Sequence, residues 1–162
     1  MTTLLMQLAE QVGIKLKQRG LMLTAAESCT GGGLSYWITS IPGSSAWFDR
    51  GFVTYTNEAK IEMLDVNPQT IAHFGAVSEQ TAREMAEGAL QRSHAHISIA
   101  ITGIAGPAGG TAQKPVGTVW IAFAQQGVPT QAQENIFPGD RQAVREKTIT
   151  VVLNKLLELA TQ

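Results

Sequence analysis

The sequence has few of the features that build disulfide frameworks, membrane spans or secretion signals. It contains one cysteine, Cys29, which excludes an internal disulfide and is typical of a reducing compartment. No apolar run approaches the roughly 20 residues that cross a bilayer, and the start, MTTLLMQLAEQVGIKLKQRG, lacks the basic region of a signal peptide. We therefore expect a cytoplasmic protein that has no membrane partner.

A large charge of either sign is also absent. The 12 basic and 13 acidic side chains give a formal net charge of −1, which argues against a nucleic-acid partner. The chain is long enough to bury a hydrophobic core, and no repeat, linker or low-complexity tract divides it. Residues 1–162 are accordingly predicted to form a single domain.

Helical and strand patterns alternate along the chain. Apolar residues at three- and four-residue spacing predict a first helix that ends at Gly20. Further helices are expected over 34–41, 56–64, 78–93 and 141–160, and strands over 21–27, 47–55, 96–103, 115–125 and 129–137. The last two strands form a hairpin around Gln126 and Gly127. The order favours an α/β fold: a three-layer α/β/α sandwich with a mixed, mostly parallel sheet.

Three turns of unusual composition follow predicted strands. They are ESCTGGG at 27–33, YTNEAK at 55–60 and TGIAGPAGG at 102–110. If the three strands are parallel, their carboxyl ends lie at one edge of the sheet, where such folds bind ligands. The sequence therefore predicts a site at this edge.

Ser28, in the first turn, has two interpretations. Ser28 or Thr30 caps the helix near Leu34, or Ser28 is a nucleophile that requires a base. The three histidines, at positions 73, 94 and 96, are placed for surface or structural roles. Neither a cysteine pair nor an HExxH spacing is present, so no metal site is expected.

Lys60 is the candidate base. It falls in the first turn of a predicted helix, where the electropositive N-terminus disfavours a cation and favours a neutral amine. A solvated surface lysine is the alternative. Tyr55 is either a core aromatic or a hydrogen-bond partner of this lysine. Cys29 is a rival nucleophile, although no candidate histidine partner lies near it.

Main-chain groups and arginines complete the expected site. The N–H groups of Thr30, Gly31 and Gly32 are candidates for stabilising an oxyanion. A phosphate or ribose suits the glycine-rich third turn, which contains four candidate residues: Gly103, Gly106, Gly109 and Gly110. Arg141 and Arg145 lie four residues apart on one helix face and suit phosphate. Their alternative role is a solvated face beside Asp140 and Glu146.

Five stretches together resemble the CinA C-terminal domain family over roughly residues 5–160. They are AESCTGG, GSSAWFDRGFVTYTNEAK, GAVSEQTA, TGIAGPAGGTAQKPVGTV and GDRQAVRE. The similarity is greatest to the family's stand-alone nicotinamide-nucleotide amidases. It implies hydrolysis of the carboxamide of nicotinamide mononucleotide to nicotinate mononucleotide and ammonia. Ser28 would be the nucleophile, Lys60 its base and Tyr55 a member of their network.

The resemblance also implies no cofactor, a homodimer, and a nucleotide held by the glycine-rich turns and the arginine of GDR. Two features depart from the family pattern. Ala108 stands where an acidic or hydroxyl residue often follows GP, so one ligand contact is missing. The amino-terminal domain of full-length CinA proteins is not present, and we expect no activity that depends on it.

A second class of function uses the same residues without catalysis. The glycine turns and arginines would then form a catalytically silent module that binds a pyridine nucleotide or ADP-ribose. The position of Lys60 favours the enzyme, because a pure binder has no need of a lysine in an unfavourable helical position.

Overall fold

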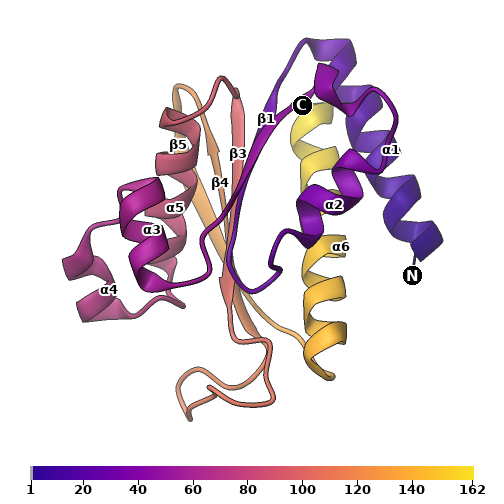
Figure 1. The fold of residues 1–162 in the computed structure, drawn as a ribbon. Helices are drawn as coiled ribbons and strands as arrows, with labels where there is room; N and C mark the ends of the chain where they lie inside the picture. The colour runs from indigo at the N-terminus through magenta and orange to yellow at the C-terminus, as the bar shows by residue number, and fades with distance from the viewer. Residues whose placement is uncertain (1) are drawn as a thin grey trace.

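A computed structural model describes residues 2–162. Figure 1 shows its helices and strands. The helices are α1 (Thr2–Arg19), α2 (Gly33–Thr39), α3 (Asn57–Leu64), α4 (Pro68–Phe74), α5 (Glu79–Gln91) and α6 (Arg141–Thr161), with a short 3-10 turn at Ser44–Ala46. The strands are β1 (Leu23–Glu27), β2 (Phe48–Val53), β3 (Ile97–Gly103), β4 (Thr118–Gln125) and β5 (Val128–Ile136). None of the helices in this part of the chain is long and apolar enough to cross a membrane.

One mixed sheet forms the middle layer, in the order β2-β1-β3-β4-β5. β1 pairs in parallel with β2 and β3, whereas β3–β4 and β4–β5 are antiparallel. β4 alone therefore runs against the other strands of residues 2–162. The predicted mixed sheet is confirmed, although half of its ladders are antiparallel because the β4–β5 hairpin extends one edge.

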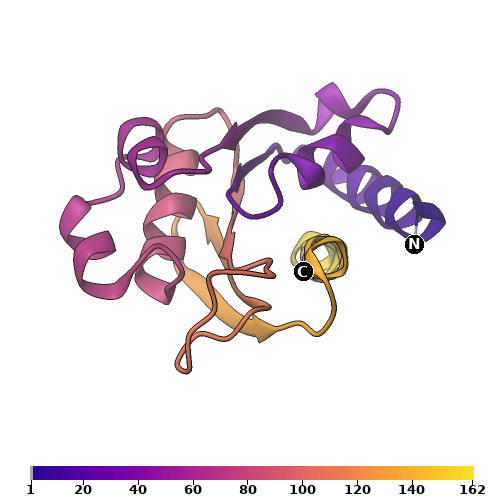
Figure 2. The ribbon, with the colours of Figure 1, turned by 60° about the horizontal axis from the view of Figure 1, so that its bottom comes forward.

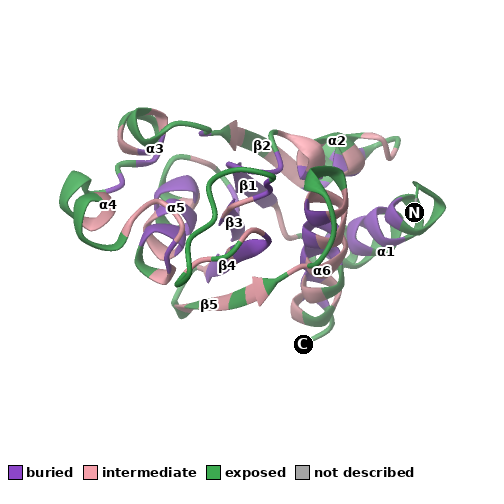
Figure 3. Cartoon of the chain, turned by 90° about the horizontal axis from the view of Figure 1, so that it is seen from below, coloured by how far each residue is buried: buried purple, intermediate pink, exposed green. Residues whose placement is uncertain are grey.

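Helices cover both faces of the sheet. Figures 1 and 2 show α3, α4 and α5 on one side and α1, α2 and α6 on the other. Buried residues lie on the sheet and on the helix sides that face it (Figure 3). Large apolar side chains such as Ile99 and Ile121 face α1 and α6, whereas alanines such as Ala26 and Ala100 face α5. The predicted three-layer α/β/α sandwich is confirmed.

Helix α4 lies over residues 68–74, for which the apolar pattern predicts no helix. Asn67 caps this helix, since its side chain accepts from the N–H of Gln69 over 2.9 Å, and Pro68 occupies the first turn. Both are signals of a helix start. They were missed because seven residues are too few to show a helical apolar period, and no residue of α4 is buried.

Helix α5 lies against the end of α3, and Gly88 makes this approach possible. A Cβ atom at Gly88 would lie 1.9 Å from the carbonyl oxygen of Leu64. We expect Gly88→Ala to lower the free energy of unfolding by about 1–3 kcal/mol, because backbone must move to admit the methyl group. Chemical denaturation beside the exposed control Glu87→Ala tests this. Since alanine is the better helix former, a stabilised Gly88→Ala protein would contradict the close contact.

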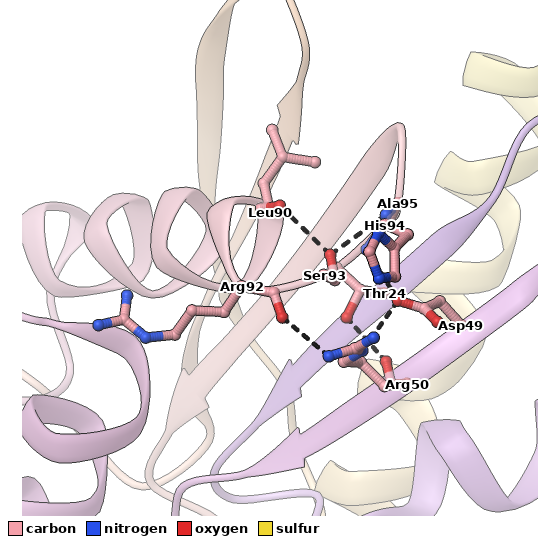
Figure 4. Close-up of polar contacts among 8 residues, drawn as sticks. All are labelled: Thr24, Asp49, Arg50, Leu90, Arg92, Ser93, His94 and Ala95. Carbon is pink, nitrogen blue, oxygen red and sulfur yellow. Dashed lines mark hydrogen bonds and ion pairs between the residues drawn. The ribbon is translucent and has the colours of Figure 1, made fainter.

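Polar side chains join the elements at the amino-terminal edge of the parallel strands (Figure 4). Asp49 accepts from the N–H of His94, and Arg50 donates to the carbonyl of Arg92 over 3.1 Å. Thr24 Oγ1 donates to the carbonyl of Arg50 over 2.7 Å. These contacts fix β2 to the segment before β3. They leave the carboxyl edge of the strands free for the three turns described next.

Candidate active site

Ser28 is the first residue after β1, and its side chain continues the alternation of side-chain directions along the strand. Its N–H donates to the carbonyl of Ile101 over 3.0 Å, so the parallel ladder with β3 extends to this residue. Neighbouring side chains of a strand point to opposite faces. Glu27 therefore faces α2, whereas Ser28 faces α3.

Lys60 reaches Ser28 from α3. Thr56 caps this helix by accepting from the N–H of Ala59 over 3.1 Å, which places Lys60 in the first turn as predicted. Lys60 Nζ lies 3.0 Å from Ser28 Oγ. It also donates to the carbonyl oxygens of Thr54 and Tyr55, over 3.0 and 3.2 Å. Two residues separated by 31 others in the chain are thus in direct contact.

The environment of Lys60 disfavours its charge. The side chain is 1% exposed, which excludes the surface-lysine alternative. Burial lowers the pKa of Lys60 below its ordinary value of 10.5, and only the Cys29 thiol acts in the opposite direction. No carboxylate in residues 2–162 forms an ion pair with it. The amine is therefore suited to accept a proton.

A cavity of about 280 Å³ opens at this pair, close to the lower end of small-molecule sites. Its walls come from all three predicted turns and from the segment before α5. They comprise Ser28, Cys29, Tyr55, Asn57, Lys60, Ala76, Val77, Thr102, Gly103, Ile104, Ala105, Gly106, Ala108, Gly109 and Arg141. The predicted meeting of the three turns at one edge is confirmed.

Tyr55 contacts Lys60 through its main chain, and not through its hydroxyl as was expected. Its main-chain carbonyl, not its hydroxyl, accepts from Lys60 Nζ and lies 3.4 Å from Ser28 Oγ. The hydroxyl accepts from Arg141 Nη2 over 2.8 Å, and the residue is 56% exposed, which excludes a core role. Arg141 Nη1 also donates to the carbonyl of Gly106 over 2.8 Å. Arg141 and Tyr55 therefore border the cavity mouth.

The predicted oxyanion donors lie in the turn after Ser28 but outside the cavity wall, so their role stays a prediction. The N–H of Gly31 already donates to the carbonyl of Ser28 over 3.0 Å, and none of Thr30, Gly31 and Gly32 lines the cavity. Gly31 and Gly32 have φ angles of 58° and 96°, which glycine adopts without the strain of a side chain. These glycines shape the tight turn into α2.

The predicted arginine pair is divided between two cavities. Arg145 does not line the cavity with Ser28. It belongs to a second one of about 230 Å³ between α2 and α6, beside Trp37 and Glu146, and donates from Nη2 to the carbonyl of Thr30 over 3.1 Å. Arg141 and Arg145 therefore line different cavities, and a ligand that both of them bind stays a prediction.

Not all of the predicted glycines of the third turn line the cavity with Ser28. Gly103, Gly106 and Gly109 line the first cavity, whereas Gly110 does not. A Cβ atom at Gly103 would lie 2.7 Å from Val119, and one at Gly106 would lie 2.4 Å from Val116. Close packing of this loop on the segment before β4 and on the start of β4 therefore already favours glycine at both positions.

The histidines lie away from Ser28, as expected. His96 Nδ1 accepts from the N–H of Met22 over 2.9 Å, which is a structural contact. His73 lies in the last turn of α4, and the N–H of His94 donates to Asp49. Within residues 2–162 no group of three His, Cys, Asp or Glu side chains is placed to hold a metal ion.

Cys29 is a poor rival to Ser28. It is 5% exposed, and burial, which outweighs the opposing effects, raises the pKa of its thiol to about 12. We expect iodoacetamide at about pH 8 to leave the native protein unmodified, because the reactive thiolate is absent. Cys29→Ala should retain most of the hydrolysis that the family resemblance implies. Loss of that activity by a folded Cys29→Ala protein would favour the thiol as nucleophile.

Two contacts in the site lay outside the sequence-based expectations. The carbonyl of Thr54 accepts from Lys60, and the buried Glu27 carboxylate accepts hydrogen bonds from the start of α2. A signal for Glu27 was present, because a strand that places Ser28 on one face must direct Glu27 to the other. Of the two interpretations of the Ser28 turn, the helix cap is excluded, because the N-cap is Gly32 and neither Ser28 nor Thr30 caps α2.

Comparisons with known proteins show which family this chain resembles and which solved structures share its fold. Residues 5–160 match the family model of the CinA C-terminal domain. The curated nicotinamide-nucleotide amidohydrolase PncC of Escherichia coli K12 is 54% identical over 152 residues, which are 94% of this chain and 92% of that protein. The protein of the same name from Pseudomonas putida is 44% identical over 155 residues, 96% of each chain. The crystal structure of competence/damage inducible protein CihA from Agrobacterium tumefaciens has a TM-score of 0.94 at 45% identity, and covers 98% of this chain and 96% of that one.

Proposed function

The chain belongs to the CinA C-terminal domain family, and on this premise we propose that it hydrolyses nicotinamide mononucleotide to nicotinate mononucleotide and ammonia. The names of two relatives that match nearly their whole length support the class of reaction, a hydrolase that acts on the amide of a nicotinamide nucleotide. A homodimer, which the family resemblance implies, stays a prediction.

The contact between Ser28 and Lys60 is the observation that carries the proposal. A neutral amine has two N–H donors and one lone pair. The carbonyl oxygens of Thr54 and Tyr55, at 3.0 and 3.2 Å, can take both donors. The lone pair then faces Ser28 Oγ at 3.0 Å. This arrangement fits a general base that removes the hydroxyl proton of a serine nucleophile.

The first half of the reaction forms an acyl-enzyme. Ser28 Oγ attacks the carboxamide carbon while its proton passes to Lys60 Nζ. The tetrahedral intermediate collapses, the C–N bond breaks, and the Lys60 ammonium returns the proton to the departing nitrogen. Ammonia leaves, and the nicotinoyl group remains as an ester on Ser28.

The second half hydrolyses this ester with the same base. Neutral Lys60 accepts a proton from water as the water oxygen attacks the ester carbonyl. The ester C–O bond then breaks, and Lys60 returns the proton to Ser28 Oγ. The new carboxylic acid loses its remaining proton to solvent, the carboxylate product leaves, and both side chains recover their starting states. No step requires a metal ion or an organic cofactor.

Arg141 is placed to bind the phosphate of the nucleotide. Its guanidinium lies at the cavity mouth between Tyr55 and Gly106, and a guanidinium pairs with phosphate in a bidentate manner. Ala108, also in the wall, offers no polar side chain. The phosphate contact therefore depends on Arg141 and the main chain.

We expect Arg141→Ala to lower kcat/KM for nicotinamide mononucleotide by about 10- to 100-fold, the effect of one charged hydrogen bond. The same variant assayed with nicotinamide riboside, which has no phosphate, should lose far less. Steady-state ammonia release with both substrates checks this. An equal loss for both would mean that Arg141 does not contact the phosphate.

Ammonia release from nicotinamide mononucleotide in the presence of EDTA tests the function itself. The alternative, a catalytically silent module that binds a pyridine nucleotide or ADP-ribose, predicts ligand-dependent thermal stabilisation without ammonia. A buried lysine held against a serine hydroxyl favours the enzyme, since binding alone gains nothing from that contact. Stabilisation without turnover would overturn the proposed function.

A further inference from the structure

Glu27, next to Ser28 in the chain, is a buried carboxylate that pairs with no cation in residues 2–162. Its side chain is 0% exposed. Oε1 accepts from Thr30 Oγ1 over 2.6 Å and from the N–H of Leu34 over 2.9 Å. Oε2 accepts from the N–H and the hydroxyl of Ser35 over 2.9 and 2.7 Å. Four hydrogen bonds thus compensate a charge whose burial would otherwise be very unfavourable.

These bonds supply what the start of α2 lacks. Its N-cap, Gly32, has no side chain and makes no capping hydrogen bond. The first N–H groups of a helix have no partner within the helix, and two of them, at Leu34 and Ser35, donate to Glu27. The electropositive helix terminus also favours a negative charge at this place. The carboxylate therefore ties the last residue of β1 to α2 across the turn that begins with Ser28.

The main chain of Glu27 extends this connection to the base. The N–H of Thr54 donates to the carbonyl of Glu27 over 2.9 Å, and the carbonyl of Thr54 accepts from Lys60 Nζ. One residue is thus bonded both to the turn that holds the nucleophile and to the segment that orients the base.

We propose that Glu27 is a positioning residue, whose carboxylate holds the 28–33 turn so that Ser28 Oγ stays in contact with Lys60. This inference rests on the proposed function, in which Ser28 is the nucleophile. Glu27 touches neither the cavity nor Lys60, so it acts only through the turn. Without its carboxylate the glycines of the turn allow other backbone conformations, and Ser28 moves.

Glu27→Gln is the most direct test, because it keeps the shape and replaces one acceptor oxygen by a donor. We expect kcat for ammonia release to fall about 100-fold, the usual effect of misplacing a reacting group by about 1 Å. KM should change by less than about threefold, since the walls that bind substrate are unchanged. The rate at which an organophosphorus fluoride labels Ser28 should fall with kcat.

Glu84→Gln provides a matched control. Glu84 also holds a helix start, because it accepts from the N–H of Asn67 over 2.8 Å and from Thr70 Oγ1 over 2.6 Å near the beginning of α4. Its loss should lower the melting temperature while kcat per labelled serine stays at the parent value. If Glu27→Gln does not fold, Ser35→Ala removes one donor to the carboxylate. It should lower kcat by about 3- to 10-fold, the effect of one neutral hydrogen bond.

The labelling rate of Ser28 and kcat for ammonia release test the positioning role and the proposed function separately. A parent protein that labels at Ser28 but releases no ammonia would overturn the proposed substrate, and slower labelling of Glu27→Gln would still support the positioning role. If a folded Glu27→Gln protein has the labelling rate and the kcat of the parent, the positioning role of Glu27 is overturned. A loss that matches Glu84→Gln, in stability alone, would overturn it as well.

Discussion

Ser28→Ala is expected to lower kcat for ammonia release by about 10⁴- to 10⁶-fold, since removal of a nucleophile abolishes the covalent route and leaves only binding and electrostatic effects. Affinity for nicotinamide mononucleotide should remain near the parent value, because the hydroxyl is one small part of the cavity wall. Turnover measured by ammonia release and affinity measured by calorimetry check the two expectations separately.

A second buried serine gives the control for this variant. Ser98 on β3 is 0% exposed, and its hydroxyl has no hydrogen-bond partner within residues 2–162. Ser98→Ala should therefore keep full activity. If Ser28→Ala retained more than about 1% of turnover, the covalent mechanism would be wrong, because nucleophile deletions cost far more than that.

Lys60→Met is expected to reduce kcat by about 10⁴-fold or more, since the serine then has no base. The double variant with Ser28→Ala should be no slower than either single variant, because the two residues act as one unit. Methionine matches the length of the lysine stem and needs no hydrogen bonds. Folding should therefore be retained and the free energy of unfolding at neutral pH should rise.

The lowered pKa of Lys60 also predicts a pH dependence of stability. Burial makes the folded state hold this proton less tightly than the unfolded state, where the pKa is about 10.5. Between the two pKa values the unfolded chain binds more protons, so the free energy of unfolding rises with pH, by at most about 1.4 kcal/mol per pH unit. The buried charge of Lys60 destabilises the folded state fully below the folded-state pKa and not at all above 10.5.

Denaturant unfolding of the parent and of Lys60→Met over a series of pH values measures this effect as a difference. The difference between the two curves should change with pH below 10.5 and become constant above it. In parallel, kcat/KM of the parent should increase with pH as Lys60 becomes neutral. A stability difference that does not change with pH would show that Lys60 has an ordinary pKa and would weaken its assignment as the base.

The sequence was sufficient for the architecture. Alternating strands and helices predicted a three-layer fold with a mixed sheet, and the Gln126–Gly127 turn between β4 and β5 lies where it was expected. Apolar periodicity and turn residues are local properties, so they can be recognised without knowing which elements touch. The short α4 was missed for the same reason, since it buries no residue and shows no period.

Part of the site was also predictable. Parallel strands end at one edge, so the turns that hold Ser28 and Lys60 had to lie close together. A lysine in the first turn of a helix is locally unfavourable, and that conflict marked Lys60 before its burial was known. Chain direction and helix electrostatics thus made Lys60 a candidate base for Ser28, beside the alternative of a surface lysine, and the family resemblance implied the roles of the two residues.

The directions of individual side chains were decided only by the tertiary structure. Arg141 and Arg145 share a helix face, yet they line different cavities, and Arg145 donates to the carbonyl of Thr30 in the 28–33 turn. Tyr55 contacts Lys60 through its carbonyl, and Glu27 replaces the missing cap of α2. Local sequence determines which element forms and where it ends. Which group meets which partner depends on packing between elements distant in the chain, and no local pattern contains that information.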